Sequence, residues 1–258
     1  MNTTIFYYSG TGNSLSVAKN LANKLDGQYV NISKYLNANS QVITSDAVGF
    51  VFPCYAYSYP KVLNTLIKKI KFSSMPRYVF AIITYGSTFG RTGMKFIKQL
   101  KKNGFKTDYM TGILMPENYI AIFRPDSASV IDTKLANAKV RIEQISDDIK
   151  NQVQYIERHS KPLDYIKTSI VSTIFNGFLH FSHIFFKAKK SCSSCEICVK
   201  VCPVDNIVMK NGKPKWGRHC TQCMACLNWC PKKCIDYTPI TKKRSRYTNP
   251  DIELKELI

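Results

Sequence analysis

Hydrophobic runs and polar segments alternate in a regular order over the first 115 residues of the chain. Apolar runs of strand length cover residues 3–8, 46–52, 77–84 and about 106–115. Helical patterns lie between them, at residues 15–25, 61–70 and 91–102. Strands that alternate with helices in this way predict an α/β fold built on a parallel sheet.

Two further helical patterns follow, at residues 132–158 and 163–186. In the second, apolar residues recur at three- to four-residue spacing and form a wide stripe. The favoured interpretation is a docking surface that holds the C-terminal part of the chain against the sheet. The alternative is peripheral contact of residues 163–190 with a membrane surface, because lysines follow the stripe. The stretch is too polar to span a bilayer.

Length, composition and the N-terminal residues indicate whether the chain folds and where in the cell it is expected. The chain has 258 residues, of which 45% are hydrophobic, so a packed core is expected and a mainly disordered protein is excluded. The first residues contain neither a basic segment nor a long apolar run, so a secretory signal is not expected. We therefore expect a cytoplasmic protein.

Nine of the ten cysteines fall between Cys192 and Cys234. Eight of them form two runs with the same spacing, Cys-x2-Cys-x2-Cys-x3-Cys-Pro, and each member of the second run lies 28 residues after its counterpart. This is an internal duplication. In a reducing compartment, thiols grouped in this way are more often metal ligands than disulfides.

The duplicated motif resembles bacterial ferredoxins with two clusters, in which the fourth cysteine of each run serves the other cluster. The resemblance implies two [4Fe-4S] clusters, one held by Cys192, Cys195, Cys198 and Cys230, and one by Cys220, Cys223, Cys226 and Cys202. The alternative is a pair of structural zinc sites, but zinc needs neither the third cysteine nor the Cys-Pro pair. Cys234 is left over, and we expect a small buried side chain there.

The first strand runs into a short loop of glycine and hydroxyl residues, which precedes a helix. A strand, a tight loop and a helix N-terminus form a binding site for a phosphate group. The loop lacks the lysine of a Walker A motif and the third glycine of the dinucleotide-binding motif. It resembles the FMN phosphate loop of flavodoxins, which implies phosphate binding by Ser9, Thr11, Gly12, Asn13 and Ser14.

Two later loops extend the resemblance to flavodoxins, whose sheet has the strand order 2-1-3-4-5. They follow the strands at 46–52 and 77–84, and ligands bind at that edge of a doubly wound sheet. Flavodoxins hold the isoalloxazine ring between these loops. The residues implied here are Pro53, Cys54, Tyr55, Tyr57, Ser58, Thr84, Tyr85, Gly86 and Ser87. Tyr55 and Tyr85 are the leading candidates for contact with the ring.

The order of the motifs narrows the resemblance. The phosphate-type loop, the segment Met-Pro-Glu-Asn-Tyr-Ile at 115–120, the cysteine runs and the segment Arg-Tyr-Thr-Asn-Pro at 246–250 occur together. This arrangement is similar to the EFR1-type flavodoxin–ferredoxin fusions of anaerobic bacteria. It implies a flavodoxin-like FMN domain at 1–160, a helical connector at 161–188 and a small ferredoxin-like domain at 189–240. The basic C-terminal tail at 241–258 is expected to be solvated and draped over the surface.

The formal net charge of +20 bears on the partner. Lysine pairs are scattered over both modules rather than gathered into a stripe with aromatic residues, so nucleic-acid binding is not expected. A basic protein instead attracts an acidic redox partner.

The expected function is electron transfer between FMN and two [4Fe-4S] clusters within one chain, with no catalytic residue. Such a protein would link one-electron carriers to a two-electron acceptor or donor. Two alternatives remain open. One is a flavin-dependent reductase of a small substrate, and the other is a redox-sensing or nucleic-acid-binding module with structural clusters.

Overall fold

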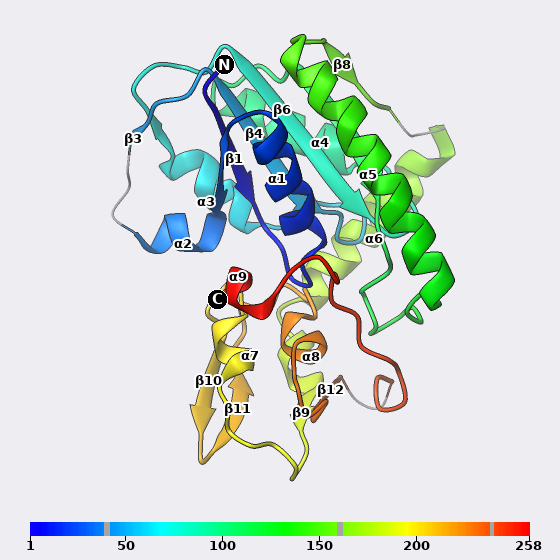
Figure 1. The fold of residues 1–258 in the computed structure, drawn as a ribbon. Coiled ribbons are helices and arrows are strands. Elements are labelled where there is room, and N and C mark those ends of the chain that lie inside the picture. The colour runs from blue at the N-terminus through cyan, green and yellow to red at the C-terminus, as the bar shows by residue number, and fades with distance from the viewer. Residues whose placement is uncertain (39–41, 159–161, 238–239) are drawn as a thin grey trace.

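The computed structural model describes all residues of the chain except 39–41, 159–161 and 238–239 (Figure 1). A sheet of six parallel strands occupies the N-terminal part, and a smaller module packs against one end of it (Figure 1). No helix of the described part is long and apolar enough to cross a membrane.

The large sheet has the order β2-β1-β4-β6-β7-β8. Its strands are β1 (Thr3–Tyr7), β2 (Gln28–Asn31), β4 (Ala47–Pro53), β6 (Tyr78–Tyr85), β7 (Tyr109–Leu114) and β8 (Tyr155–Ile156). The first five strands of this sheet, counted along the chain, have the order 2-1-3-4-5, which is that of a flavodoxin-like doubly wound fold. The predicted fold class is therefore confirmed. A short parallel pair, β3 (Val42–Ile43) and β5 (Lys71–Phe72), lies outside this sheet.

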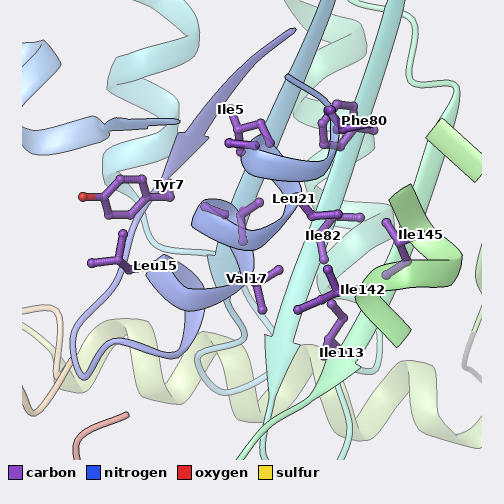
Figure 2. Close-up of a cluster of buried hydrophobic side chains, with 14 of the residues drawn as sticks. Ile5, Tyr7, Leu15, Val17, Leu21, Phe80, Ile82, Ile113, Ile142 and Ile145 are labelled. Carbon is purple, nitrogen blue, oxygen red and sulfur yellow. The ribbon is translucent and has the colours of Figure 1, made fainter. Parts of the chain in front are cut away.

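Helices cover both faces of the sheet because its central strands β1, β4, β6 and β7 are buried on both sides. On one face, α1 (Asn13–Lys24) and α5 (Ala128–Lys150) place Leu15, Leu21 and Ile142 against Ile5 and Ile82 (Figure 2). On the other face lie α2 (Ile32–Asn37), α3 (Val62–Lys69) and α4 (Thr92–Lys102). All three contribute side chains to a second core that contains several phenylalanines.

The sixth strand corrects the prediction of a helix over 132–158. Helix α5 ends at Lys150, and the chain turns at Gln152, whose φ is 53°. β8 then pairs with the start of β7, and the Glu157 carboxylate accepts a hydrogen bond from the backbone N–H of Gly112 at 2.9 Å. A strand of two residues is too short to show the alternation of apolar and polar residues that marks a strand. The helical pattern of the preceding residues therefore extended over it.

The connector is helical as predicted, in α6 (Pro162–Phe178) and the 3-10 helix η1 (Ser182–Phe185), but its apolar stripe is split: its isoleucines point outward, whereas the ring of Phe175 contacts Tyr119 and that of Phe185 contacts Tyr237 of the C-terminal module. Ile166, Ile170 and Ile174 are 53–66% exposed, whereas Thr168 and Ser172 are 4–5% exposed. Helix α4 explains this orientation, because Lys95 Nζ donates a hydrogen bond to Ser172 Oγ at 2.6 Å. The isoleucines therefore do not form the predicted docking surface. Membrane contact of this face stays a prediction.

The C-terminal module consists of short elements around two antiparallel strand pairs. The pairs are β9 (Phe186–Ala188) with β12 (Ile235–Tyr237), and β10 (Ile207–Lys210) with β11 (Lys213–Trp216). The helices α7 (Ile197–Lys200) and α8 (Ala225–Asn228) each contain the third cysteine of one run. Both of these cysteines are buried in the small core beside Ile207 and Ile235, as is Cys234.

Residues 241–258, which we call the C-terminal segment, are the part of the chain predicted to be a solvated basic tail draped over the surface. Lys242 and Lys243 are exposed as expected, but the chain then folds back over the N-terminal domain (Figure 1). Tyr247 and Asn249 are buried, and Ile252 joins the core beside α1. The segment ends in α9 (Leu254–Leu257).

Candidate functional site

A cavity of about 340 Å³ lies at the carboxyl ends of β4, β6 and β7. Loops that follow these three strands form most of its wall, and α6 and the C-terminal module complete it. This is the edge at which doubly wound sheets bind their ligands. The cavity therefore lies where the sequence placed a flavin site.

Most of the predicted ring-binding residues line this cavity. Those that do are Pro53, Cys54, Tyr55, Tyr57, Thr84, Tyr85, Gly86 and Ser87. Ser58 does not, because its backbone bonds to Tyr55 and the residue lines a neighbouring cleft. Of the phosphate-loop residues, Asn13 alone reaches the cavity wall, at the end nearest the loop.

The sequence analysis did not assign several other residues of the cavity wall. They include Glu117, Asn118, Tyr119, Ile122, Phe123, Val171, Phe175 and Gln222. The first three belong to the 115–120 segment, which directly follows β7. Its position after a third neighbouring strand was the signal that could have placed it at the site. Phe175 belongs to the apolar stripe of residues 163–186, which was predicted to be a docking surface and not part of the flavin site, and Gln222 carried no such signal.

The phosphate-type loop has the geometry of an anion site. The backbone turns at Gly12, with φ of 98°, and the helix α1 begins at the next residue. Among the described residues, no acceptor pairs with the backbone N–H groups of Thr11, Asn13 and Ser14. Unpaired N–H groups at a helix N-terminus suit a phosphate, because they donate hydrogen bonds and carry partial positive charge. The loop therefore fits a phosphate without a cationic side chain.

Side-chain hydrogen bonds hold this loop in place. Ser14 Oγ lies 2.7 Å from Thr84 Oγ1 of β6, and Asn118 Nδ2 donates to Thr11 Oγ1 at 2.6 Å. The Asn13 side chain donates to the backbone oxygen of Pro116 and accepts from Tyr247 in the C-terminal segment. The loop is thus tied to β6, to the segment after β7 and to the C-terminal segment.

Aromatic side chains give the cavity its apolar character. Burial raises the pKa of Tyr55 well above its usual value, and the thiols of Cys223 and Cys220 add to the effect. Burial also raises the pKa of Tyr85, whose ring contacts that of Phe89 at 5.2 Å. Both phenols are therefore neutral over the physiological range. Neutral aromatic walls are suited to a planar ring such as isoalloxazine.

Cys54 sits at the cavity wall as a protonated thiol. Burial raises its pKa, and its sulfur lies 3.1 Å from Thr92 Oγ1. A raised pKa makes a thiol a weak nucleophile. The structure therefore offers no reason to assign Cys54 a covalent role.

The eight motif cysteines fall into two groups, in the crossed pattern that the ferredoxin resemblance implied. One cavity is lined by Cys192, Cys195, Cys198 and Cys230, which we call the outer site. A second cavity is lined by Cys202, Cys220, Cys223 and Cys226, which we call the inner site. The fourth cysteine of each run thus joins the first three of the other.

The electrostatics of both sites fit a cationic occupant. Burial and the thiols of Cys192, Cys195 and Cys230 raise the pKa of Cys198 to about 11. Burial and the inner-site thiols likewise raise the pKa of Cys226. Thiolates held this close repel one another, so a positive cluster core is needed to keep them ionised.

No three His, Cys, Asp or Glu side chains within the described ranges are placed to hold one ion. Zinc would draw its sulfur ligands to within about 2.3 Å of one point. A four-iron cluster is larger and bonds each thiolate at a different corner.

The two sites differ in the groups that donate hydrogen bonds to sulfur. At the inner site, backbone N–H groups of Asn206 and Gln222 donate to Cys202 and Cys220 at 3.3 and 3.4 Å. The indole N–H of Trp216 donates to Cys226 Sγ at 3.5 Å. At the outer site, the extra thiol of Cys234 lies 3.4 Å from Cys230 Sγ. Cys234 is buried, as predicted.

The inner site abuts the flavin-type cavity. Gln222, between two inner-site cysteines, lines that cavity and accepts a hydrogen bond from Tyr119 OH at 3.1 Å. A Cβ atom on Gly10 of the phosphate-type loop would lie 2.6 Å from the backbone oxygen of Cys223. Tyr8 OH also lies 2.7 Å from Thr221 Oγ1. The two candidate cofactor sites are therefore neighbours across a closely packed interface.

Comparison with known protein families supports an iron–sulfur assignment for the C-terminal module. Residues 191–235 match the family described as "4Fe-4S dicluster domain". The match covers both cysteine runs. The remainder of the chain lies outside this match, and no curated protein matches the chain.

Solved structures similar to the chain include three flavin-type proteins. A putative flavoprotein from Bacteroides eggerthii shares 17% identity over 43% of this chain and 87% of its own, with a TM-score of 0.34. An archaeal flavodoxin shares 13% sequence identity, and the match covers 58% of this chain and 99% of the flavodoxin, with a TM-score of 0.37. Megasphaera elsdenii flavodoxin shares 15% sequence identity, and the match covers 43% of this chain and 84% of the flavodoxin, with a TM-score of 0.32. At these scores the fold assignment rests on the strand order described above.

Proposed function

We propose that this protein transfers electrons between FMN and two [4Fe-4S] clusters held in the same chain. The observation that carries the proposal is the position of Gln222, which lies in the inner-site loop and also forms part of the flavin-type cavity wall. An electron carrier at one site is thereby placed next to a carrier at the other. The arrangement fits a flavodoxin–ferredoxin fusion of the EFR1 type, acting in the cytoplasm.

The chain's own residues define how each group would be held. The N–H groups of Thr11, Asn13 and Ser14 would bind the phosphate of FMN, and Tyr55 and Tyr85 would flank its ring. Bound flavin exchanges one or two electrons, whereas each cluster exchanges one, so the pair would link carriers of the two kinds. Tyr119 OH donates a hydrogen bond to Gln222 Oε1 at the shared wall and so ties the segment after β7 to the inner-site loop.

The alternatives have less support. A reductase of small substrates needs open space above the ring, but Phe175 of α6 and Gln222 of the C-terminal module both form walls of the cavity. A nucleic-acid-binding module with structural clusters has no need of a cavity with aromatic walls at the sheet edge. Electron transfer uses both sites and their contact.

Anaerobic purification followed by flavin, iron and zinc analysis tests the proposal. We expect about one FMN and about eight iron atoms per chain, four for each cluster. Cys195→Ala and Cys223→Ala, at equivalent positions of the duplication, should each reduce the iron content to about half, because each removes a ligand of one cluster. Cys54→Ala, outside both cysteine groups, is the control and should leave it unchanged. Iron without flavin, or zinc in place of iron, would contradict the proposal.

A further inference from the structure

The two cysteine sites differ in how the rest of the molecule covers them. The inner site packs against the N-terminal domain through Cys223 and Thr221. The outer site lies near the opposite end of the module, where Ser194 Oγ donates a hydrogen bond to the backbone oxygen of Gly212 at the tip of the β10–β11 hairpin. In Figure 1 this hairpin points away from the large sheet. Cys195 is exposed there, so the outer site is open to another protein.

Basic side chains outnumber acidic ones around the outer site, whose wall contains Lys232 and one exposed carboxylate, Glu196. Residues 187–233 contain ten lysines and arginines but two acidic residues. Lys232 lines the outer cavity itself, and Lys233 and Lys190 are exposed close to it in the chain. Among the described residues, none of these three lysines forms an ion pair, so their charge is directed to solvent.

The duplication shows that the pair Lys232 and Lys233 belongs to the outer half alone, whereas Lys190 has a basic counterpart in Arg218. Lys232 and Lys233 stand 28 residues after Val204 and Asp205, their counterparts beside the inner site. Asp205 is acidic and accepts a hydrogen bond from Asn37 of the N-terminal domain at 2.9 Å. The basic pair therefore occurs at the exposed cluster site and not at the covered one.

We infer that the surface around the outer site, formed by Lys190, Lys232 and Lys233 beside exposed Cys195, is the docking surface for an acidic protein that carries single electrons. This inference rests on the proposed function and adds the partner and its place of contact. Electrons pass one at a time between the partner and the outer cluster, then to the inner cluster and the flavin. The partner gains or loses one electron in each encounter, and the outer cluster changes by the same amount.

Charge and access both favour a protein partner. A positive surface attracts a negatively charged protein before contact and can increase its association rate by about 10- to 1000-fold at low salt. The lysine side chains are long and mobile, so they suit an encounter complex that forms and dissociates quickly. A small molecule would gain little from charges spread over this surface.

The test is stopped-flow reduction of the complete, cofactor-loaded protein by an acidic bacterial two-cluster ferredoxin under anaerobic conditions. The docking variant is Lys190→Glu/Lys232→Glu/Lys233→Glu. A matched control, Lys68→Glu/Lys101→Glu/Lys102→Glu, makes the same change of charge on exposed positions of α3 and α4. We expect the second-order rate constant at low salt to fall at least about tenfold in the docking variant and less than about threefold in the control. In 0.5 M salt the difference between the variants should disappear.

Equal losses in both variants would show an effect of net charge only and would overturn the docking surface. An unchanged rate in the docking variant would also overturn it. The same holds if the docking variant lost binding to a DNA duplex but kept its rate of electron transfer. Iron and flavin contents of every variant are measured first. Failure of the proposed function would appear there, as missing flavin or iron in the unmodified protein, before any kinetics are recorded.

Discussion

Trp216 shows how a single side chain can distinguish two sites built from the same motif. Its indole N–H donates to Cys226 Sγ at 3.5 Å, and its ring stacks on Phe186 at 5.3 Å. A hydrogen bond to a cluster ligand stabilises the reduced state, which carries the greater negative charge. The inner cluster should therefore have a higher potential than the same cluster without this donor.

Trp216→Phe keeps an aromatic ring but removes the donor, so we expect the potential of the inner cluster to fall. A weak hydrogen bond of about 1 kcal/mol corresponds to a shift of about 40 mV for one electron. Redox titration followed by electron paramagnetic resonance measures it. Trp229→Phe is the control, because that indole donates to the backbone oxygen of Gly10 and not to sulfur. Equal shifts in the two variants would show that the Trp216 bond has no specific effect.

At the scale of elements, the strands with strong patterns were predictable and the pieces that complete the site were not. β4 and β6 are long apolar runs that end close to where the pattern predicts, and two of the cavity loops follow them. Helix α6 has Ile166, Ile170 and Ile174 outside, while Ser172 faces α4 and accepts a hydrogen bond from Lys95, whose pKa is lowered by burial and by nearby Arg91. The spacing of apolar residues shows which of them share a helix face. It does not show the direction of that face, because a polar residue on the opposite face can point inward to pair with a buried polar group.

The C-terminal segment lies over the N-terminal domain, but several of its residues are more deeply buried than a solvated run would be. Its basic run, which includes exposed Lys242 and Lys243, suggested a solvated tail. The residues that attach the segment to the phosphate-type loop follow this run and do so through hydrogen bonds. Asn249 N–H donates to the backbone oxygen of Thr11 at 2.8 Å, and Tyr247 OH donates to Asn13 Oδ1 at 2.7 Å. Hydrogen bonds between distant segments leave no period in a sequence. Their partners become visible only when the fold brings them together.

Tyr247→Phe tests whether this segment supports the phosphate-type loop. The ring keeps its packing, but Asn13 loses a hydrogen bond worth about 1 kcal/mol, and the loop that would bind phosphate becomes less ordered. We expect FMN to bind about five- to tenfold more weakly, measured by quenching of flavin fluorescence. The control is Tyr29→Phe, at a position that is 39% exposed. If Tyr247→Phe lowered the melting temperature with an unchanged dissociation constant for FMN, the segment would be structural only.

At the scale of the whole molecule, the proposed electron transfer would depend on the contact between the phosphate-type loop and the inner site. Gly10 lies at this contact, where a Cβ would approach the backbone oxygen of Cys223 to 2.6 Å and Cys223 Cβ to 3.0 Å. A backbone oxygen cannot move aside as a flexible side chain can. A larger residue at position 10 would therefore displace one module from the other.

Gly10→Ala should lower stability by about 1–3 kcal/mol through this overpacking and slow electron exchange between the inner cluster and the flavin severalfold, because the sites move apart. Thermal unfolding gives the first quantity, and the rate of flavin reduction after rapid reduction of the clusters gives the second. Gly177→Ala in α6 is the matched control, since nothing lies within 4 Å of the position that its new methyl group would take. It should leave the rate unchanged. Flavin content is measured in both variants, so a slower rate in a fully loaded Gly10→Ala protein reports on the distance between the sites. An unchanged rate and melting temperature would show that the contact is loose, and the direct route from the inner cluster to the flavin would then have to be abandoned.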